Sequence, residues 1–277
     1  MERFDEIKTR FEKFLREVAD GFRSEPILAE AMRYSLFSGG KRIRPVMLIA
    51  AAEAFGKDAD ESVMTFAAAV ESLHVYSLVH DDLPSMDNDD YRRGMLTSHK
   101  KFGEDIAILT GDALLSESFR LILKSIEIGG FSREHFAAAK LFADKVGADG
   151  LISGQVRDLR FSESKGDELA VTDVFRGKTC ALIEAAVGAG AILGGGSDGD
   201  VNNMLGFAEA FGIAFQIADD ILDDDGEICS LVTVCGKETA VKRLGEYTAA
   251  AIDYLNKVNA DTDFFKRFTL AAKNRKR

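Results

Sequence analysis

The chain has 277 residues, of which 46% are hydrophobic, so it is long enough to bury a sizeable core. It carries 35 Lys and Arg against 46 Asp and Glu, and the resulting net charge of -11 argues against nucleic acid as the main partner. The 3 cysteines fit neither a disulfide framework nor a paired metal spacing, and the charged N-terminus has no apolar signal core. We therefore expect a cytoplasmic protein in a reducing compartment.

Helical periodicity runs through most of the chain. Apolar residues recur at three-and-four spacing over residues 27–37 and 114–126, and the segment 60–80 is apolar on nearly every side. No period-2 stretch indicates a sheet, and no Pro/Ser-rich linker divides the chain. We expect a single all-α domain over residues 1–277. The longest candidate membrane stretch, residues 185–196, is shorter than the ~20 apolar residues that a span needs, so no membrane span is predicted.

A first acidic cluster follows the apolar segment 60–80, in the sequence HDDLPSMDNDDYRRG of residues 80–94. Its aspartates are Asp81, Asp82, Asp87, Asp89 and Asp90. Pro84 disfavours helix at the residue before it, so Asp81 and Asp82 should lie at the C-terminal end of a helix, where their charge opposes the helix dipole. An EF-hand is excluded because Arg92 stands where that loop requires glycine. Taken alone, the cluster is also compatible with a solvated acidic turn.

A second acidic cluster ends another apolar helix, GFAEAFGIAFQIADDILDDD, at residues 206–225. Asp219, Asp220 and Asp223 have the spacing DDxxD, which places Asp219 and Asp223 one turn apart on the same face. Both helices gather carboxylates at positions where their mutual repulsion is unfavourable. This arrangement indicates that the two clusters share a bound cation. Mg²⁺ fits best, because it prefers carboxylate oxygens and keeps water and phosphate oxygens in its shell.

Basic residues narrow the chemistry. The segment SGGKRIRP, residues 38–45, combines a flexible glycine pair with three cations, two arginines follow the first acidic cluster, and RGKTCALIEAA precedes the second. These positions are Lys41, Arg42, Arg44, Arg92, Arg93, Lys178, Thr179 and, just before the second cluster, Gln216. In an acidic protein such residues indicate anion ligands. Mg²⁺-binding carboxylates together with Arg and Lys are what a diphosphate requires.

Six motifs in one order make the chain resemble the trans-prenyltransferases, or isoprenyl diphosphate synthases, and most closely the bacterial farnesyl diphosphate synthases. They lie within residues 33–225 and read GGKRIRP, ESLHVYSLVHDDLPSMDNDDYRRG, AILTGDALLSESF, GLISGQVRDL, RGKTCALI and GIAFQIADDILD. The ending LAAKNRKR is similar to the basic C-terminus of that family. The resemblance implies an isoprenoid synthase helical bundle around a central active-site cavity, usually as a homodimer, with the two aspartate motifs facing each other across the cavity mouth.

The resemblance also implies roles for individual residues. Three Mg²⁺ ions, or Mn²⁺ in their place, would bind to Asp81, Asp82 and Asp87 of the first motif and to Asp219, Asp220 and Asp223 of the second. Isopentenyl diphosphate would be held by Lys41, Arg44, His74 and Arg93, and the allylic diphosphate by Arg92, Lys178, Thr179 and Gln216. Without the family, His74 would be read as a core histidine. Asp89, Asp90, Asp224 and Asp225 lie outside the motifs and are interpreted as solvated helix-end charge.

The implied reaction ionises the allylic carbon–oxygen bond, lets the isopentenyl double bond attack the cation, and ends with loss of a proton, for which the departing diphosphate is a plausible acceptor. Mg²⁺ held by the aspartates and basic residues such as Lys178 would stabilise the charge on the departing diphosphate, so no side-chain nucleophile is needed. Tyr76 and Ser77, five and four residues before Asp81, would form the floor under the growing chain. The aromatic Tyr76 predicts farnesyl diphosphate, made from isopentenyl with dimethylallyl and geranyl diphosphate.

Several alternatives remain open at this point. A geranylgeranyl diphosphate synthase shares all the motifs and differs mainly at the cavity floor. A non-catalytic regulatory subunit would be expected to lose aspartates that are intact here, and a terpene cyclase would lack the isopentenyl site.

The sequence departs from the family after Asp223, where a loop with a Gly-Lys pair is missing. That loop either is deleted, which should weaken closure of the site, or was omitted from the sequence. Lys237 comes too late to replace its lysines and is expected to be an exposed helix lysine.

Overall fold

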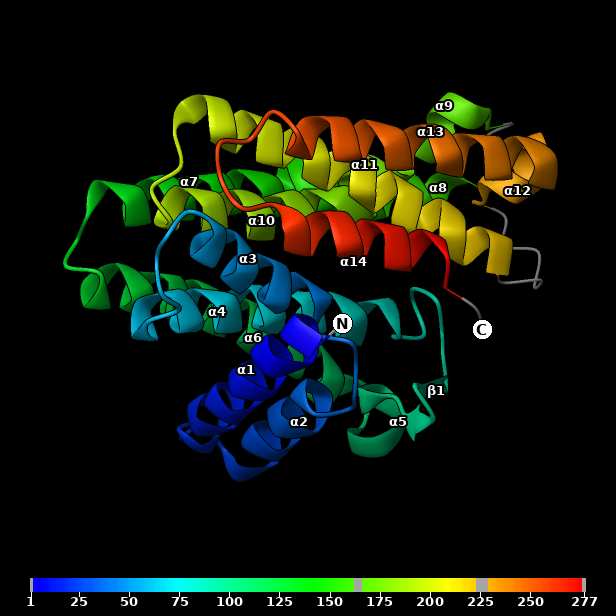
Figure 1. Ribbon diagram of the computed structural model, residues 1–277. Coiled ribbons are helices and arrows are strands. Elements are labelled where there is room, and N and C mark those ends of the chain that lie inside the picture. The colour runs from blue at the N-terminus through cyan, green and yellow to red at the C-terminus, as the bar shows by residue number, and fades with distance from the viewer. Residues whose placement is uncertain (1, 162–165, 223–228, 276–277) are drawn as a thin grey trace. The chain divides into compact units, whose positions relative to one another are not determined.

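The computed structural model describes residues 2–161, 166–222 and 229–275, and helices make up most of this part (Figure 1). The predicted all-α fold is confirmed. The described chain divides into two compact units. The first unit comprises residues 2–49 and 59–132, and the second comprises residues 50–58 and 133–277. The single domain over residues 1–277 stays a prediction.

The first unit is built around one long apolar helix, α4. Its elements are α1 (Glu2–Asp20), α2 (Pro26–Leu36), the start of α3 (Ile43–Ala54), α4 (Glu61–Asp81), β1 (Tyr91–Arg92), β2 (Met95–Leu96), α5 (Ser98–Phe102) and α6 (Glu104–Ile128). Helix α4 packs against α1, α2 and α6. The carboxylate of Asp60 accepts a hydrogen bond from the main-chain N–H of Val63, 3.0 Å away, and so caps the start of α4.

Helix α4 is the one helix in the described ranges that is long and apolar enough to cross a membrane by length and composition. By this measure α4, and not the apolar run of residues 185–196, is the candidate span in the described chain. Of the apolar window in α4, 78% is buried inside the structure, as in the central helix of a bundle.

The C-terminal end of α4 lies where Pro84 predicts it. The last helical residue is Asp81, and Asp82 is the C-cap. A short hairpin follows, in which β1 and β2 pair antiparallel with Tyr91 opposite Leu96. Its turn residues Arg93 and Gly94 both have positive φ, 53° and 78°, as a type I′ turn requires. The expectation that no sheet is present was wrong for this hairpin, because strands of two residues are too short to show a period.

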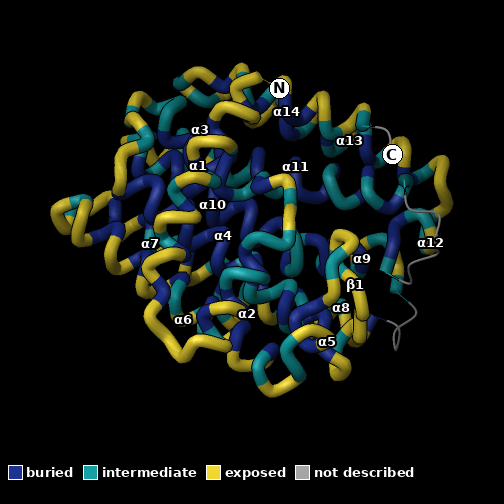
Figure 2. The backbone as a smooth tube through the Cα atoms, turned by 90° about the horizontal axis from the view of Figure 1, so that it is seen from below, coloured by how far each residue is buried: buried dark blue, intermediate teal, exposed yellow. Residues whose placement is uncertain are grey.

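The second unit is also helical. Its elements are α7 (Arg133–Val146), η1 (Ala148–Ile152), α8 (Ser153–Phe161), α9 (Glu168–Phe175), η2 (Arg176–Cys180), α10 (Ala181–Leu193), α11 (Asp198–Leu222), α12 (Leu231–Cys235), α13 (Lys237–Leu255) and α14 (Asp263–Lys273). Helix α11 packs against α10, α13, α14 and η2. Helix α10 is buried over nearly its whole length, as its dark blue trace in Figure 2 shows. These contacts fix the end of α11, where the second aspartate motif begins.

The regular helices of this unit are interrupted twice, by a kink in η1 at Gly150, whose φ of -102° and ψ of -111° are not helical, and by one turn of π-helix, η2. The second, η2, meets α8 through a pair of glycines: a Cβ on Gly154 would lie 2.2 Å from the carbonyl carbon of Gly177 and 2.3 Å from the nitrogen of Lys178. Only glycine permits this approach of the two backbones. Because π-turns inside helices frequently occur at functional sites, the segment that carries Lys178 and Thr179 is a candidate for one.

Candidate active site

The first aspartate motif lies at the end of α4, with two buried members and one exposed. The exposed fractions of Asp81 and Asp82 are 9% and 4%, whereas Asp87 is exposed. The main-chain N–H of Asp87 donates to the carbonyl oxygen of Asp81 at 2.8 Å, so the turn that follows α4 folds back onto the helix end. The backbone thereby brings the three predicted ligands of this motif to one place in the first unit.

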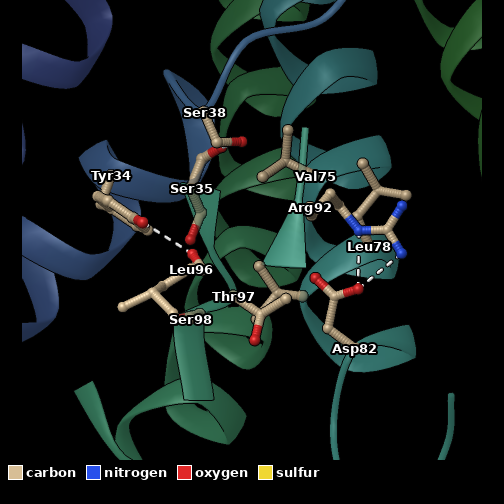
Figure 3. A pocket seen from close by; sticks show the side chains of 11 residues that line it. Tyr34, Ser35, Ser38, Val75, Leu78, Asp82, Arg92, Leu96, Thr97 and Ser98 are labelled. Carbon is tan, nitrogen blue, oxygen red and sulfur yellow. Dashed lines mark hydrogen bonds and ion pairs between the residues drawn. The ribbon is translucent and has the colours of Figure 1, made fainter. Parts of the chain in front are cut away.

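Asp82 forms a close ion pair with Arg92 (Figure 3). Both Nε and Nη2 of Arg92 contact Oδ1 of Asp82, at 2.7 and 2.6 Å. Burial raises the pKa of Asp82 above its usual value, and the Arg92 hydrogen bond opposes that rise. Arg92, predicted to bind the allylic diphosphate, here neutralises a predicted metal ligand. The pocket beside the pair has a volume of about 20 Å³, which suits one water molecule and no diphosphate.

His74 lies among guanidinium groups in the first unit. Its Nε2 is 3.2 Å from Nη1 of Arg44. Burial, followed by the charges of Arg44 and Arg93, holds the pKa of His74 well below its usual value of 6.5. The imidazole is therefore neutral at pH 7 beside two predicted anion ligands. Positive charge gathered around a neutral hydrogen-bonding ring is an arrangement that an anion would stabilise.

The glycine pair at residues 39 and 40 is a packing feature. Arg93 donates from Nη1 to the carbonyl oxygen of Gly39. Gly40 has φ 127°, and a Cβ there would lie 2.5 Å from Nη1 of Arg93. The positive φ requires glycine at this position, and the absent Cβ leaves room for the guanidinium. Lys41, the next residue, is exposed.

Arg42 was grouped with the anion ligands by the charge pattern, and that interpretation was wrong. Its guanidinium is buried, with Nη1 2.5 Å from Oε1 of Glu71 and Nη2 donating to the carbonyl oxygen of Leu36 at 2.7 Å. Since Arg42 is matched by a buried carboxylate, its charge is already neutralised. Through these contacts Arg42 links the segment before α3 to the end of α2 and to Glu71 on α4.

The two residues predicted to form the cavity floor, Tyr76 and Ser77, are half-buried on α4. The Ser77 hydroxyl donates to the carbonyl oxygen of His74 at 2.9 Å. The Tyr76 ring meets the imidazole of His80 edge to face, with ring centres 5.3 Å apart. Burial and then the Asp81 charge raise the pKa of Tyr76, so the phenol stays neutral. The floor itself stays a prediction.

The second unit holds three of the four predicted allylic-side residues, Lys178, Thr179 and Gln216, whereas Arg92 belongs to the first unit. Thr179 donates to Oε1 of Gln216 at 3.0 Å, and this contact ties η2 to α11. Nζ of Lys178 lies 2.5 Å from Oδ2 of Asp158 on α8. Asp158 belongs to the motif GLISGQVRDL, and no role for it was predicted. The available signal was an acidic residue in a motif that precedes Lys178, a predicted phosphate ligand.

The second aspartate motif makes contacts that the sequence did not predict. Oδ1 of Asp219 lies 2.5 Å from Nη2 of Arg275, whose guanidinium also covers the ring of Phe215 at 4.2 Å. Oδ2 of Asp220, which is 6% exposed, accepts a hydrogen bond from the main-chain N–H of Leu231 at 2.8 Å. Asp223 lies outside the described residues, as do Asp224 and Asp225.

Residues 223–228, where the sequence departs from the family, lie outside the described residues, so both explanations of the missing loop stay predictions. Cys229 lies beside Asp158, Asp220 and Lys178, and burial and then Asp158 raise its pKa to about 12. Lys237 is the exposed first residue of α13, as predicted.

The donor set has the chemistry that Mg²⁺ prefers. Asp81 and Asp82 supply hard carboxylate oxygens in the first unit, and Asp219 and Asp220 do so in the second. Within residues 2–161, 166–222 and 229–275, no three His, Cys, Asp or Glu side chains form a group that could hold a metal ion. Magnesium at these aspartates stays a prediction.

Comparison with known proteins gives consistent matches. Residues 25–270 match the family described as Polyprenyl synthetase. A chloroplastic geranylgeranyl pyrophosphate synthase of Capsicum annuum is 44% identical over 218 residues, which cover 78% of this chain and 58% of that protein. The large subunit 1 of a heterodimeric geranylgeranyl pyrophosphate synthase of Arabidopsis thaliana is 43% identical, covering 79% and 60%. The chain thus spans about three fifths of the length of these relatives.

Two solved bacterial structures share the fold. A geranyltransferase from Legionella pneumophila has a TM-score of 0.89 and 29% identity, covering 98% of this chain and 95% of that chain. An FPP/GFPP synthase from Zymomonas mobilis has a TM-score of 0.85 and 32% identity, covering 96% and 98%.

Proposed function

Because the chain belongs to the polyprenyl synthetase family of trans-isoprenyl diphosphate synthases, we propose that it is a trans-prenyltransferase that joins isopentenyl diphosphate to an allylic diphosphate. The single observation that carries this proposal is the cluster of Arg44 and Arg93 around neutral His74, a few turns along α4 from the buried Asp81 and Asp82. The first unit thus contains both the cations that could bind a diphosphate and the carboxylates that could bind the metal ion paired with it.

The residues divide the work as follows. Arg44, Arg93 and His74 hold the diphosphate of the isopentenyl substrate, and Lys178 and Gln216 bind the allylic diphosphate. The allylic carbon–oxygen bond breaks and its electron pair leaves with the diphosphate. The isopentenyl double bond then forms the new carbon–carbon bond, and the resulting cation gives up a proton to the departed diphosphate. Mg²⁺, when bound to the aspartates, neutralises the charge on the leaving group.

Internal ion pairs would have to open for these roles. Lys178 pairs with Asp158, and Arg92 with Asp82. A diphosphate offers more negative charge than a single carboxylate, so it competes well for either cation. When no diphosphate is bound, these ion pairs hold the side chains of Lys178 and Arg92 in place.

Two product lengths are candidates, and the comparisons support the longer one better. The curated relatives named above are geranylgeranyl synthases, which favours the C20 product. Farnesyl diphosphate, the C15 product, is favoured by the aromatic Tyr76 on α4, and one structural neighbour is an FPP/GFPP synthase. Dimethylallyl, geranyl and, for C20, farnesyl diphosphate are the allylic substrates to test.

The test is incubation of the purified chain with labelled isopentenyl diphosphate, Mg²⁺ and each allylic diphosphate in turn, followed by chromatography of the dephosphorylated products. Geranylgeraniol or farnesol as the main alcohol supports the proposal and selects the length. The absence of any prenyl alcohol with every partner contradicts it. Omitting Mg²⁺, or replacing it with Mn²⁺, tests the proposed cofactor in the same assay.

A homodimer and a cytoplasmic location are proposals of the same standing. One relative is the large subunit of a heterodimeric enzyme, so the oligomer has to be measured with the chain alone. Light scattering that gives twice the mass of the 277-residue chain would support the homodimer.

A further inference from the structure

The imidazole of His80 packs against the neighbouring helix α6. Its Nε2 lies 3.1 Å from the carbonyl oxygen of Ile108, and since a carbonyl only accepts, this nitrogen carries the proton. Gly111 lies directly under the ring: a Cβ there would be 2.0 Å from Nε2. Helix α6 therefore offers the imidazole a hydrogen-bond acceptor, and the missing Cβ of Gly111 leaves room for the ring.

His80 in turn supports the ring of Tyr76, one turn earlier on α4. The two rings meet edge to face with an interplanar angle of 80° and centres 5.3 Å apart. This is a preferred geometry for aromatic pairs. A tyrosine on a helix normally has more than one staggered χ1 rotamer, and a neighbour fixed on the next helix selects one of them. The ring of Tyr76 is thus supported by His80, whose own position is fixed by its contacts with α6.

We propose that His80 is a specificity-determining residue, which sets the length of the prenyl product by holding Tyr76 across the path of the growing chain. This inference rests on the proposed function. A block made of one half-buried side chain would yield by rotation when a longer chain pressed on it. The pair of Tyr76 and His80, seated on Gly111, resists that rotation.

The test compares the product lengths of variants with that of the wild-type chain under one set of conditions. His80→Ala removes the support and should raise the ratio of the next longer product to the wild-type product at least tenfold. Gly111→Ala should act in the same direction with both aromatic side chains intact, because its methyl group displaces the imidazole. His80→Phe keeps an aromatic edge against Tyr76 and should retain the wild-type length.

The double variant separates positioning from direct blocking. If His80 acts through Tyr76, Tyr76→Ala and Tyr76→Ala/His80→Ala give the same lengthened products. Gly245→Ala is the matched control, because a Cβ at Gly245 meets nothing within 4 Å, and it should leave the length unchanged. Thermal melting of each variant checks that it is folded.

The outcomes are distinct. Wild-type length in His80→Ala and in Gly111→Ala, with lengthening in Tyr76→Ala, overturns the role of His80 and leaves the enzyme class intact. If His80→Ala is inactive because it adjoins Asp81, Gly111→Ala decides alone. A wild-type chain that forms no prenyl product from any allylic partner overturns the proposed function instead.

Discussion

Breaking the buried pair of Arg42 and Glu71 should be among the most destabilising changes in the first unit. The side chains are 2% and 3% exposed, and Nη1 lies 2.5 Å from Oε1. Removing one partner of such a pair leaves an uncompensated buried charge and costs about 3–5 kcal/mol. We therefore expect Arg42→Met and Glu71→Leu each to lower the free energy of unfolding by this amount, a large part of the ~5–15 kcal/mol of a typical domain.

The double variant tests the reasoning behind that magnitude. Arg42→Met/Glu71→Leu removes both charges of the pair and leaves two acceptors without this donor, the carbonyl of Leu36 and the half-buried carboxylate of Glu12, 3.5 Å from Nε of Arg42. Its loss should be about 1 kcal/mol, far below the sum of the single variants.

Urea unfolding followed by far-UV circular dichroism measures these changes. The control is Lys140→Ala, which removes an exposed pair with Asp144 whose side chains are 77% and 61% exposed and should change the stability by less than ~0.5 kcal/mol. Single variants that lose no more than Lys140→Ala, or a double variant that loses the sum, would refute the view that Arg42 is a structural cation.

Three further predictions follow from the site. Because the pKa of His74 lies below 6.5 in the folded chain, the unfolded chain binds the extra proton as the pH falls below 6.5, and stability should drop by at most about 1.4 kcal/mol per pH unit. His74→Gln should reduce the pH dependence of the melting temperature between pH 6.5 and 5.5. An unchanged dependence would count against a neutral imidazole. Gly154→Ala should lower the free energy of unfolding by about 1–3 kcal/mol and weaken binding of the allylic substrate, because the new methyl group displaces Gly177. The control Gly245→Ala should have neither effect. Equal melting curves for Gly154→Ala and the wild-type chain would exclude the close backbone contact. Cys229, with a pKa raised from 9.0 to about 12, should have a roughly 1,000-fold smaller thiolate fraction at pH 8 than an ordinary thiol, so peptide mapping should find it alkylated by iodoacetamide only after unfolding.

The positions of the first aspartates were predictable because they depend on local rules. Pro84 limits the backbone of the preceding residue, so α4 ends at Asp81 and the carboxylates gather at that end. The apolar character of residues 60–80 likewise predicted a central helix, and α4 is buried on almost every side.

The role of a charged residue depends on its tertiary partners, and there the sequence was insufficient. Arg42 and Arg44 are two positions apart in one basic motif, yet Arg42 pairs with buried Glu71 while Arg44 adjoins His74. Asp158 is recognisable only through its contact with Lys178, which is twenty residues away in the sequence.

The most direct test of the central claim is a stoichiometric one. The purified chain is given isopentenyl and geranyl diphosphate with Mg²⁺, and inorganic diphosphate released is measured against isopentenyl diphosphate consumed. The same measurement is made on Asp82→Ala, and on Asp198→Ala as a control with an exposed aspartate at the start of α11. We predict one diphosphate per isopentenyl unit consumed in the wild-type and control chains, with release at least 100-fold slower in Asp82→Ala. Diphosphate released without consumption of isopentenyl diphosphate, or at an equal rate in Asp82→Ala, would contradict the proposed prenyl transfer at this site.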